Sequence, residues 1–195
     1  MKSITLYYSS FSWQRYFIIT DDVVFDFNGT SESSEDYSPE DLSSVMGNKA
    51  RKISFEILTV EKRDNVPIIA IGSCSHFGAF QIMHNKDGII GLNAWTGEYS
   101  SILTGKKIND NTWHNVVVTY DGNTLRIFVD GLPDSESKTW DNGAFLRNTM
   151  NTQGKTIFLG KKLVLDDDLT NFPMKGKLRN VRFYNFEVSK IAIRG

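Results

Sequence analysis

Cysteine is almost absent from this chain, since Cys74 is the only one among 195 residues. A single cysteine excludes an intramolecular disulfide and metal sites built on pairs of cysteines. The fold must therefore depend on its apolar core, and a chain of this length can bury a sizeable one. The cysteine count does not settle the compartment, because secreted domains without disulfides, cytosolic proteins and virion proteins all fit it.

Strong net charge and long apolar runs are also missing. The formal net charge is −1, which favours neither nucleic acid nor an anionic membrane as a partner. No apolar run reaches about 18 residues, so we expect no membrane span. Residues 1–20 do not make a convincing signal peptide, because serine and tyrosine interrupt the apolar stretch and Arg15 follows.

Helical periodicity is the third absence, with only Pro39–Val45 and Glu187–Ile191 able to form a helical turn. Two-residue alternation replaces it, most clearly in TWHNVVVTYDGNTLRIFVDG, residues 112–131. There Val116, Val118 and Tyr120 share one face of a strand, and Gly122 lies in the turn to a second strand. This segment therefore predicts a β-hairpin.

The same alternation, punctuated by glycine and asparagine turns, recurs along the chain. Further strands are expected at 23–27, 52–60, 67–72, 79–84, 88–95, 155–160 and 177–186. Short strands at such regular spacing predict an all-β sandwich or barrel. We expect loops at 28–48 and 134–154, a single sandwich domain over 21–195, and residues 1–20 as an N-terminal extension or an extra hairpin.

Several of these segments, in this order, resemble the laminin-G-like modules of the concanavalin A-like lectin/glucanase superfamily. They are FDFNGTSE at 25–32, KISFEILTV at 52–60, WHNVVVTYDG at 113–122 with LRIFVDG at 125–131, and MKGKLRNVRFYNFEVS at 174–189. The resemblance covers about residues 23–193. It implies an antiparallel jelly-roll sandwich, with Trp113 filling the core between the sheets.

The resemblance also implies ligands that the residues alone do not establish. Many such modules hold one Ca²⁺ at the rim, and oxygens for it could come from Asp166–Asp168 with Asn171, or from Asp110 with Asn111. Solvated loop acids are the alternative, so the metal site stays open. Some members bind sulfated glycans, and alternation would place Lys177, Arg179 and Arg182 near one surface.

Catalytic patterns are not found. Glucanases need two carboxylates on one strand face, as in E-x-D-x-x-E, and no strand carries that arrangement. No G-x-S-x-G nucleophile elbow occurs. We expect His114 to be a half-exposed surface histidine. The sequence therefore predicts that the protein is not an enzyme.

A ligand site is predicted at GLNAWTGEY, residues 91–99, where a strand runs into a loop. Sugars stack on aromatic rings while amides and carboxylates bind their hydroxyls. Asn93, Trp95, Glu98 and Tyr99 offer these groups, although Trp95 could equally be a core residue. Trp140, in a polar loop, and His76, between two strands, are further candidates.

These observations favour a non-catalytic recognition or adhesion module that binds a glycan or a cell-surface protein through its rim loops. The alternative is a structural subunit or spacer of a virion, fibre or filament, docked through residues 1–20. A glycoside hydrolase is the least favoured function. We expect an extracellular, cell-surface or virion-associated location rather than a cytosolic one.

Overall fold

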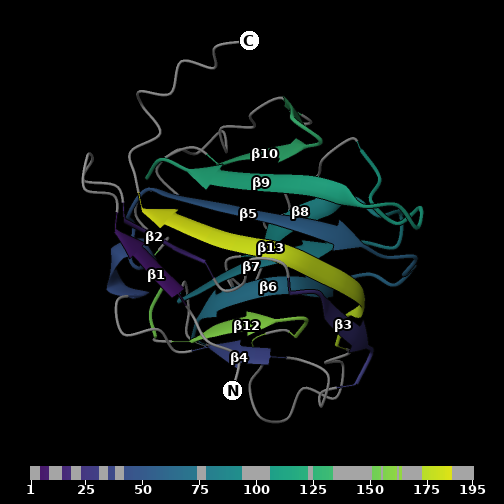
Figure 1. Cartoon of the computed structure of the whole chain (residues 1–195), viewed down its shortest axis with the longest axis horizontal. Coiled ribbons are helices and arrows are strands. Elements are labelled where there is room, and N and C mark those ends of the chain that lie inside the picture. Colours follow the sequence, from purple (N-terminus) through teal and green to yellow (C-terminus); the bar gives the residue numbers. More distant parts are fainter. Residues whose placement is uncertain are drawn as a thin grey trace.

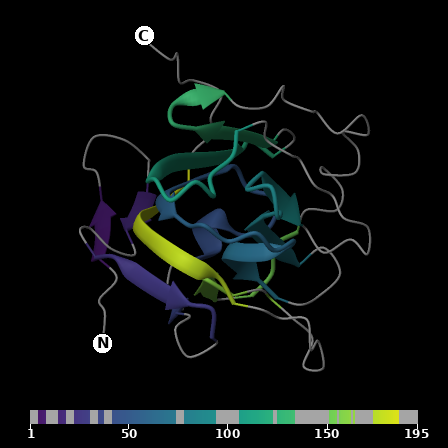
Figure 2. The same ribbon diagram turned by 90° about the vertical axis from the view of Figure 1, so that its right-hand side faces the viewer.

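The computed structural model describes residues 5–8, 15–18, 23–30, 35–37, 42–73, 78–93, 106–122, 125–133, 151–154, 156–161, 163 and 173–185. Two antiparallel sheets are stacked face to face, as the turned view shows (Figures 1 and 2). The predicted antiparallel sandwich is confirmed.

The larger sheet has eight strands, and β13 is its longest. Along the sheet the order is β1 (Thr5–Tyr8), β2 (Arg15–Ile18), β13 (Lys175–Asn185), β5 (Arg51–Leu58), β9 (His114–Tyr120), β10 (Leu125–Val129) and β11 (Leu132–Pro133). The eighth strand, β3 (Phe25–Asn28), pairs only with β13. The predicted hairpin at 112–131 is thus β9 and β10.

The smaller sheet has five strands. Their order is β4 (Glu35–Tyr37), β12 (Ile157–Leu159), β6 (Val66–Gly72), β7 (Ala79–His84) and β8 (Ile90–Asn93). A short 3-10 helix, η2 (Leu42–Val45), forms at one of the two expected helical turns, and the other lies outside the described residues. No helix among the described residues is long and apolar enough to cross a membrane.

One edge of β13 is shared by two strands. β3 pairs with its first part, Lys175–Leu178, and β2 with its last part, Arg182–Asn185, so the two lie end to end along it (Figure 1). On the other edge, the pairing with β5 shifts register between Arg179 and Arg182, which marks a β-bulge. Asn180 in the bulge has φ of 54°. A bulge inserts a residue and re-aims the side chains beside it.

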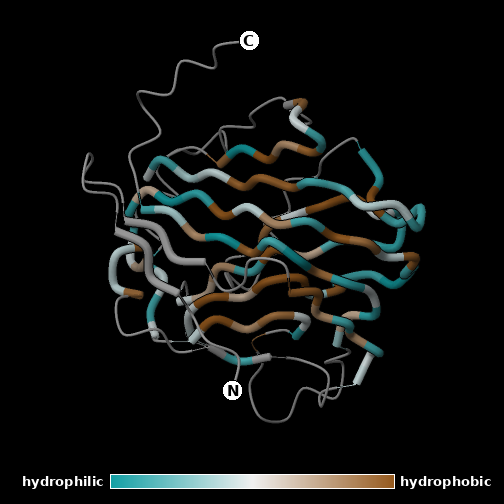
Figure 3. Tube along the Cα trace, in the orientation of Figure 1, coloured by the Kyte–Doolittle hydropathy of each residue, from teal (hydrophilic) through white to brown (hydrophobic). Residues whose placement is uncertain are grey.

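The core lies between the sheets, and hydrophobic residues recur along the strands of both (Figure 3). In β5 every second residue is buried, as period-two alternation requires. The core includes Phe25, Phe27, Ile53, Phe55, Ile57, Ile69, Ile71, Phe80, Ile82, Val116, Val118, Ile127, Ile157, Leu159, Leu178, Val181 and Phe183. Burial of this apolar surface is the main favourable term in folding.

The two sheets differ in what happens to their outer faces. β6 and β7 are buried at every position, so the smaller sheet is covered on both sides. Ala70, Ala79 and Leu163 form a second apolar cluster on its outer side, with Phe158 packed against it. The outer side chains of β5 and β13 remain partly exposed. The larger sheet therefore offers the open strand surface among the described residues.

A buried guanidinium closes one end of the sandwich. Arg51 is fully buried and donates to the Lys49 carbonyl at 3.1 Å, to Thr152 Oγ1 at 2.9 Å and to the Gly47 carbonyl at 2.5 Å. Its Cζ lies 5.0 Å from the centre of the Phe80 ring and 5.5 Å from that of Tyr120. Burial lowers the pKa of Arg51 to about 10. Oxygen acceptors and aromatic rings stabilise this cation.

Replacing Arg51 should therefore destabilise the fold. Arg51→Met removes the donor to the buried Thr152 hydroxyl and those to two carbonyls, and a buried acceptor left without a donor costs about 1–3 kcal/mol. Arg51→Lys keeps a buried charge but loses the planar fork, so we expect a loss of similar size. Arg126, which is partly exposed and paired with Asp121 at 3.3 Å, supplies the control Arg126→Met, with a change below about 1 kcal/mol. Equilibrium denaturation measures all three, and an Arg51→Met variant as stable as the wild type would contradict this account.

Candidate functional site

The start of β9 directs consecutive side chains to opposite sides of the larger sheet. His114 shares the inward side with Val116, whereas Asn115 faces outward and is exposed. Trp113, directly before the strand, also faces outward and is partly exposed. Two polar groups of residues form around this point, one at the rim between the sheets and one on the outer face.

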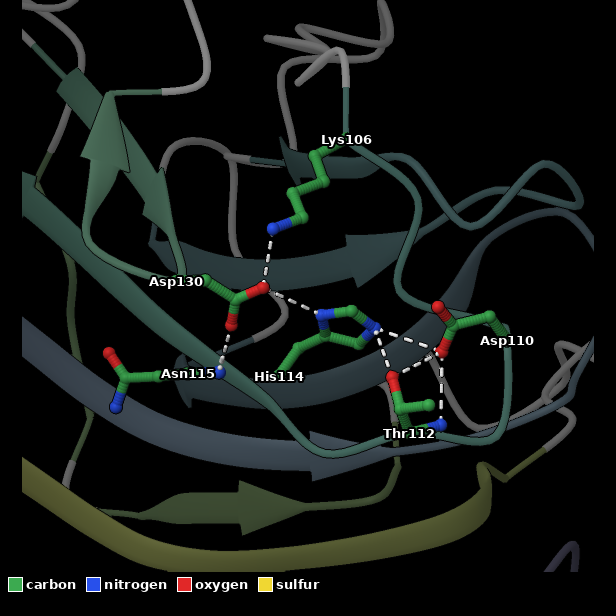
Figure 4. A network of polar contacts seen from close by, with 6 residues as sticks. All are labelled: Lys106, Asp110, Thr112, His114, Asn115 and Asp130. Carbon is green, nitrogen blue, oxygen red and sulfur yellow. Dashed lines mark hydrogen bonds and ion pairs between the residues drawn. The ribbon is translucent and has the colours of Figure 1, made fainter.

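The group at the rim, which we call the His114 cluster, comprises Lys106, Asp110, Thr112, His114, Asn115 and Asp130 (Figure 4). His114 Nδ1 lies 3.0 Å from Asp130 Oδ2, and Nε2 lies 3.0 Å from Asp110 Oδ1. Lys106 Nζ donates to the same Asp130 oxygen, and the Asn115 N–H donates to Asp130 Oδ1 at 2.9 Å. The cluster joins the loop before β9, β9 itself and the turn after β10.

The charges of the cluster stabilise one another. Burial lowers the pKa of His114, but hydrogen bonds to Asp130 and Asp110 and their negative charges outweigh it, so the net shift is upward. Hydrogen bonds from Thr112 and His114 lower the pKa of Asp110 to about 2. Burial alone would raise the pKa of Asp130, but hydrogen bonds from Lys106 and His114 outweigh it and lower that pKa to about 2.

The cluster resembles a catalytic triad in outline but differs from one in the partners of its hydroxyl and of its imidazole. Thr112 Oγ1 lies 3.1 Å from His114 Nε2, and Asp130 lies on the other ring nitrogen, in the order hydroxyl, imidazole, carboxylate. In this cluster the Thr112 hydroxyl donates its hydrogen bond to Asp110, at 2.6 Å, rather than to His114. His114 Nε2 also faces Asp110. A carboxylate at each ring nitrogen favours the imidazolium form and raises the pKa of His114, and an imidazolium has no lone pair with which to accept a proton.

Hydrogen bonds connect the smaller sheet to this rim. The Ile108 N–H donates to the Gly88 carbonyl at 3.0 Å, and Asn109 Nδ2 donates to the carbonyls of Glu61 and Lys86, both at 3.1 Å. Gly88 has φ of 76°, and a Cβ there would lie 2.3 Å from Asn109 Oδ1. Only glycine allows so close an approach of the β7–β8 turn to residues 106–109.

The group on the outer face, which we call the Trp113 platform, comprises Trp113, Arg179, Glu56 and Asn180. Arg179 Cζ lies 4.1 Å from the centre of the Trp113 ring. Arg179 Nε donates to Glu56 Oε2 at 2.7 Å, and Asn180 Nδ2 donates to Glu56 Oε1 at 2.7 Å. The β13 bulge lets these two successive residues share one carboxylate. The hydrogen bonds and nearby charges outweigh desolvation and lower the pKa of Glu56.

The platform lies within a larger surface, the open face, formed by the outward side chains of β3, β13, β5, β9 and β10. Aromatic and charged residues alternate on it, and Lys52 Nζ lies 4.9 Å from the Tyr184 ring centre. Asp26 pairs with Lys177 at 3.1 Å, and Asp121 with Arg126. The described part of this surface includes Asp26, Lys52, Ser54, Glu56, Trp113, Asn115, Arg126, Phe128, Lys177, Arg179, Arg182 and Tyr184.

Most of the predicted ligand residues lie outside the described residues, namely His76, Trp95, Glu98, Tyr99 and Trp140. Asn93 is described as the last residue of β8, in register with Gln81 of β7. Gln81 is fully buried and accepts the Leu163 N–H at 3.0 Å, and within the described part of the chain its Nε2 has no hydrogen-bond partner. The prediction for this set remains a prediction.

Two expectations for the start of β9 are wrong. His114 is buried, with 5% of its surface exposed, because its position in β9 points inward and two carboxylates compensate the polar ring. Trp113 does not fill the core, because it lies on the outer side, against Arg179. Lys177 and Arg179 share one face, as alternation predicts, and the β-bulge brings Arg182 to that face as well. The pairing of Glu56 with Arg179 and Asn180 was not anticipated.

Among the residues that the structure describes, no group of three or more histidine, cysteine, aspartate and glutamate side chains could hold a metal ion. Of the residues considered for Ca²⁺, Asp166–Asp168 and Asn171 lie outside that part of the chain. Asp110 is described, and its Oδ1 accepts hydrogen bonds from Thr112 and His114.

Known proteins share this architecture. Residues 55–194 match the family described as the concanavalin A-like lectin/glucanases superfamily, in its laminin G form. No curated protein sequence matches the chain. Among solved structures, laminin alpha1 domains LG4-5 of mouse have a TM-score of 0.55 and 17% identity. That similarity covers 82% of this chain and 40% of the laminin chain, so the chain spans less than half of it.

Two similar structures are bacterial carbohydrate-binding domains of comparable size. The CBM40 of a Ruminococcus gnavus sialidase, bound to alpha2,6 sialyllactose, has a TM-score of 0.62 and 13% identity, over 86% of this chain and 92% of that one. Domain 4 of the arabinanase AbnA from Geobacillus stearothermophilus, in complex with arabinotriose, has a TM-score of 0.59 and 14% identity, over 94% and 75%. At these identities the similarity establishes the fold.

The His114 cluster predicts a pH dependence of stability. Because the folded pKa of His114 is raised above 6.5, its stabilisation is complete below that pH and is lost as pH rises through the folded pKa. The contributions of Asp110 and Asp130 are present above 3.8 and are lost as pH falls towards 2. We expect His114→Gln to abolish the alkaline loss, measured as unfolding free energy against pH.

His84 provides an internal control for this measurement. Burial lowers its pKa, so it destabilises the fold as pH falls below 6.5, which is opposite in sign to His114. The acidic loss should therefore persist in His114→Gln. A variant curve parallel to that of the wild type above pH 6.5 would show that His114 does not carry the charge assigned to it.

Proposed function

The chain belongs to the concanavalin A-like lectin/glucanases superfamily, and on that premise we propose that it is a non-catalytic module that recognises glycans. The observation that carries this proposal is the Trp113 platform, where the Arg179 guanidinium lies over a partly exposed indole and Glu56 fixes both Arg179 and Asn180 by hydrogen bonds. The sialyllactose and arabinotriose bound by two similar domains are consistent with it.

The chemistry of the open face suits a sugar. Pyranose and furanose rings present C–H faces that pack on aromatic rings, and hydroxyls that both donate and accept hydrogen bonds. Trp113 supplies the apolar surface, while Arg179 and Asn180 supply donors. Because Glu56 fixes both donors, a ligand would meet groups that lose little conformational freedom on binding.

The same contacts argue against hydrolysis on this face. A glycosidase needs one carboxyl group with a raised pKa to protonate the leaving oxygen. The pKa of Glu56 is lowered instead, and both of its oxygens accept hydrogen bonds. Among the described residues, the other acids near this face are paired, Asp26 with Lys177 and Asp121 with Arg126. We therefore propose binding without catalysis.

The predicted rim site is a second place for the same function. Asn93 ends β8 of the smaller sheet, and we propose, from the sequence alone, that Trp95, Glu98, Tyr99, His76 and Trp140 belong to the same site. A glycan or a cell-surface protein is the ligand proposed there. The two sites are distinguishable because Trp113 and Trp95 can be changed separately.

One observation favours a second candidate function, assembly into a larger structure. β1 is an edge strand of the eight-stranded sheet, paired on one side with β2. An edge strand presents backbone donors and acceptors that can pair with another chain. Residues 1–20 would then dock the module onto a neighbour, and this function is compatible with an open face that binds glycan.

Glycan arrays that include sialyllactose and arabinotriose test the proposal. We expect Trp113→Ala to weaken binding at least tenfold, or about 1.4 kcal/mol, because truncating an aromatic anchor removes most of its contact. Trp113→Phe should retain part of the affinity, and Trp95→Ala should retain all of it. Circular dichroism and thermal unfolding establish that each variant is folded.

Other outcomes separate the alternatives. If Trp95→Ala loses glycan binding and Trp113→Ala keeps it, the glycan site lies at the predicted rim. If the protein binds no glycan and forms oligomers that dissociate when residues 1–20 are deleted, its function is assembly rather than glycan recognition. Release of reducing sugar from a β-glucan would overturn the non-catalytic assignment.

A further inference from the structure

The turn after β3 carries Asn28-Gly29-Thr30, the only Asn-X-Ser/Thr sequence in the chain. This sequence is the acceptor motif for N-linked glycosylation, and it has meaning only where the residue is reachable. Asn28 and Thr30 are both exposed, and the glycine between them is partly exposed. The motif therefore lies at the surface of the folded domain rather than in its core.

The three residues hold the acceptor amide in a defined geometry. The Thr30 hydroxyl donates to Asn28 Oδ1 at 2.8 Å, and the Thr30 N–H donates to the same oxygen at 2.9 Å. Gly29 has φ of 88°, which permits the tight turn. The hydroxyl that the motif requires thus contacts the carboxamide that would be modified.

Strand alternation directs the asparagine away from the core. Phe25 and Phe27 of β3 are buried, whereas Asp26 and Asn28 are exposed. β3 lies at the margin of the larger sheet, beside the start of β13 (Figure 1). A glycan attached there would extend from the edge of the open face without displacing a buried side chain.

Asp26 places an acidic residue just before the acceptor motif. It lies two residues before Asn28 and its side chain is 67% exposed, although it pairs with Lys177. An acidic residue at this distance is what the stricter, bacterial form of the acceptor motif requires. The five residues Asp26–Thr30 satisfy that form as well as the general one.

We propose that Asn28 is an acceptor site for an N-linked glycan. In the reaction, Asn28 Nδ2 bonds to the anomeric carbon of a lipid-diphosphate-linked oligosaccharide. The bond between that carbon and the diphosphate oxygen breaks, the diphosphate leaves with the electron pair, and Nδ2 loses one proton. No oxidant or reductant is needed. The site does not depend on glycan recognition by the Trp113 platform.

The experiment uses the folded chain, purified unmodified from the bacterial cytosol. It is incubated with a purified single-subunit bacterial oligosaccharyltransferase and a lipid-diphosphate-linked oligosaccharide, and intact mass and peptide mapping are recorded. We expect modification at Asn28, retained in Thr30→Ser and lost in Thr30→Val and in Asn28→Gln. The two threonine variants form a matched pair that differs in the hydroxyl.

Two comparisons decide the outcome. A synthetic peptide of residues 23–31 runs in parallel, and a peptide that is modified while the folded chain is not would overturn the proposal. Asp26→Asn should abolish modification by the bacterial enzyme but preserve it when the leader-fused chain is translated with endoplasmic-reticulum microsomes. A wild-type chain that is protected inside those microsomes yet unmodified would also overturn the proposal.

Discussion

Packing of the inner faces of the two sheets against each other is the constraint on which the remaining features depend. Once Ile53, Phe55, Phe80, Val116 and their neighbours fill that layer, chemistry can lie only on outer faces or at rims. The outer face of the smaller sheet is not available for such chemistry, because β6 and β7 are buried on both sides. What the described residues leave free is the open face and the rim around His114.

Period-two alternation was enough to predict the sandwich and most of its strands. Ile53, Phe55 and Ile57 alternate with Ser54 and Glu56, and the burial of β5 follows that alternation. The hairpin of β9 and β10 is predictable in the same way, because Gly122 separates two segments with alternating hydrophobic residues. The burial of both faces of β6 could not be read in this way, because a continuous apolar run has no period to interpret.

The functional chemistry was less predictable because it depends on exceptions to alternation. The bulge at Asn180 places Arg179 and Asn180 on the same carboxylate, and nothing in KLRNVRF marks where the register shifts. His114 was interpreted as a surface residue because histidine is polar. Its inward position becomes tolerable only through Asp110 and Asp130, which lie in two separate turns. Such pairings are tertiary facts, so residue type and spacing alone do not reveal them.

The shape of the open face sets how strongly it could bind. The described part of the open face is a strand surface, which covers one side of a sugar, whereas a pocket encloses most of a ligand's surface. Hydrogen bonds that fix Arg179 and Asn180 reduce the entropy lost on binding, but they do not add buried area. A single module of this kind would bind weakly, and useful strength would come from several copies held together. The outer edge of β1, which is unpaired among the described strands, and the Trp113 platform would then serve one purpose, because assembly through the first would supply the multivalency that the second requires.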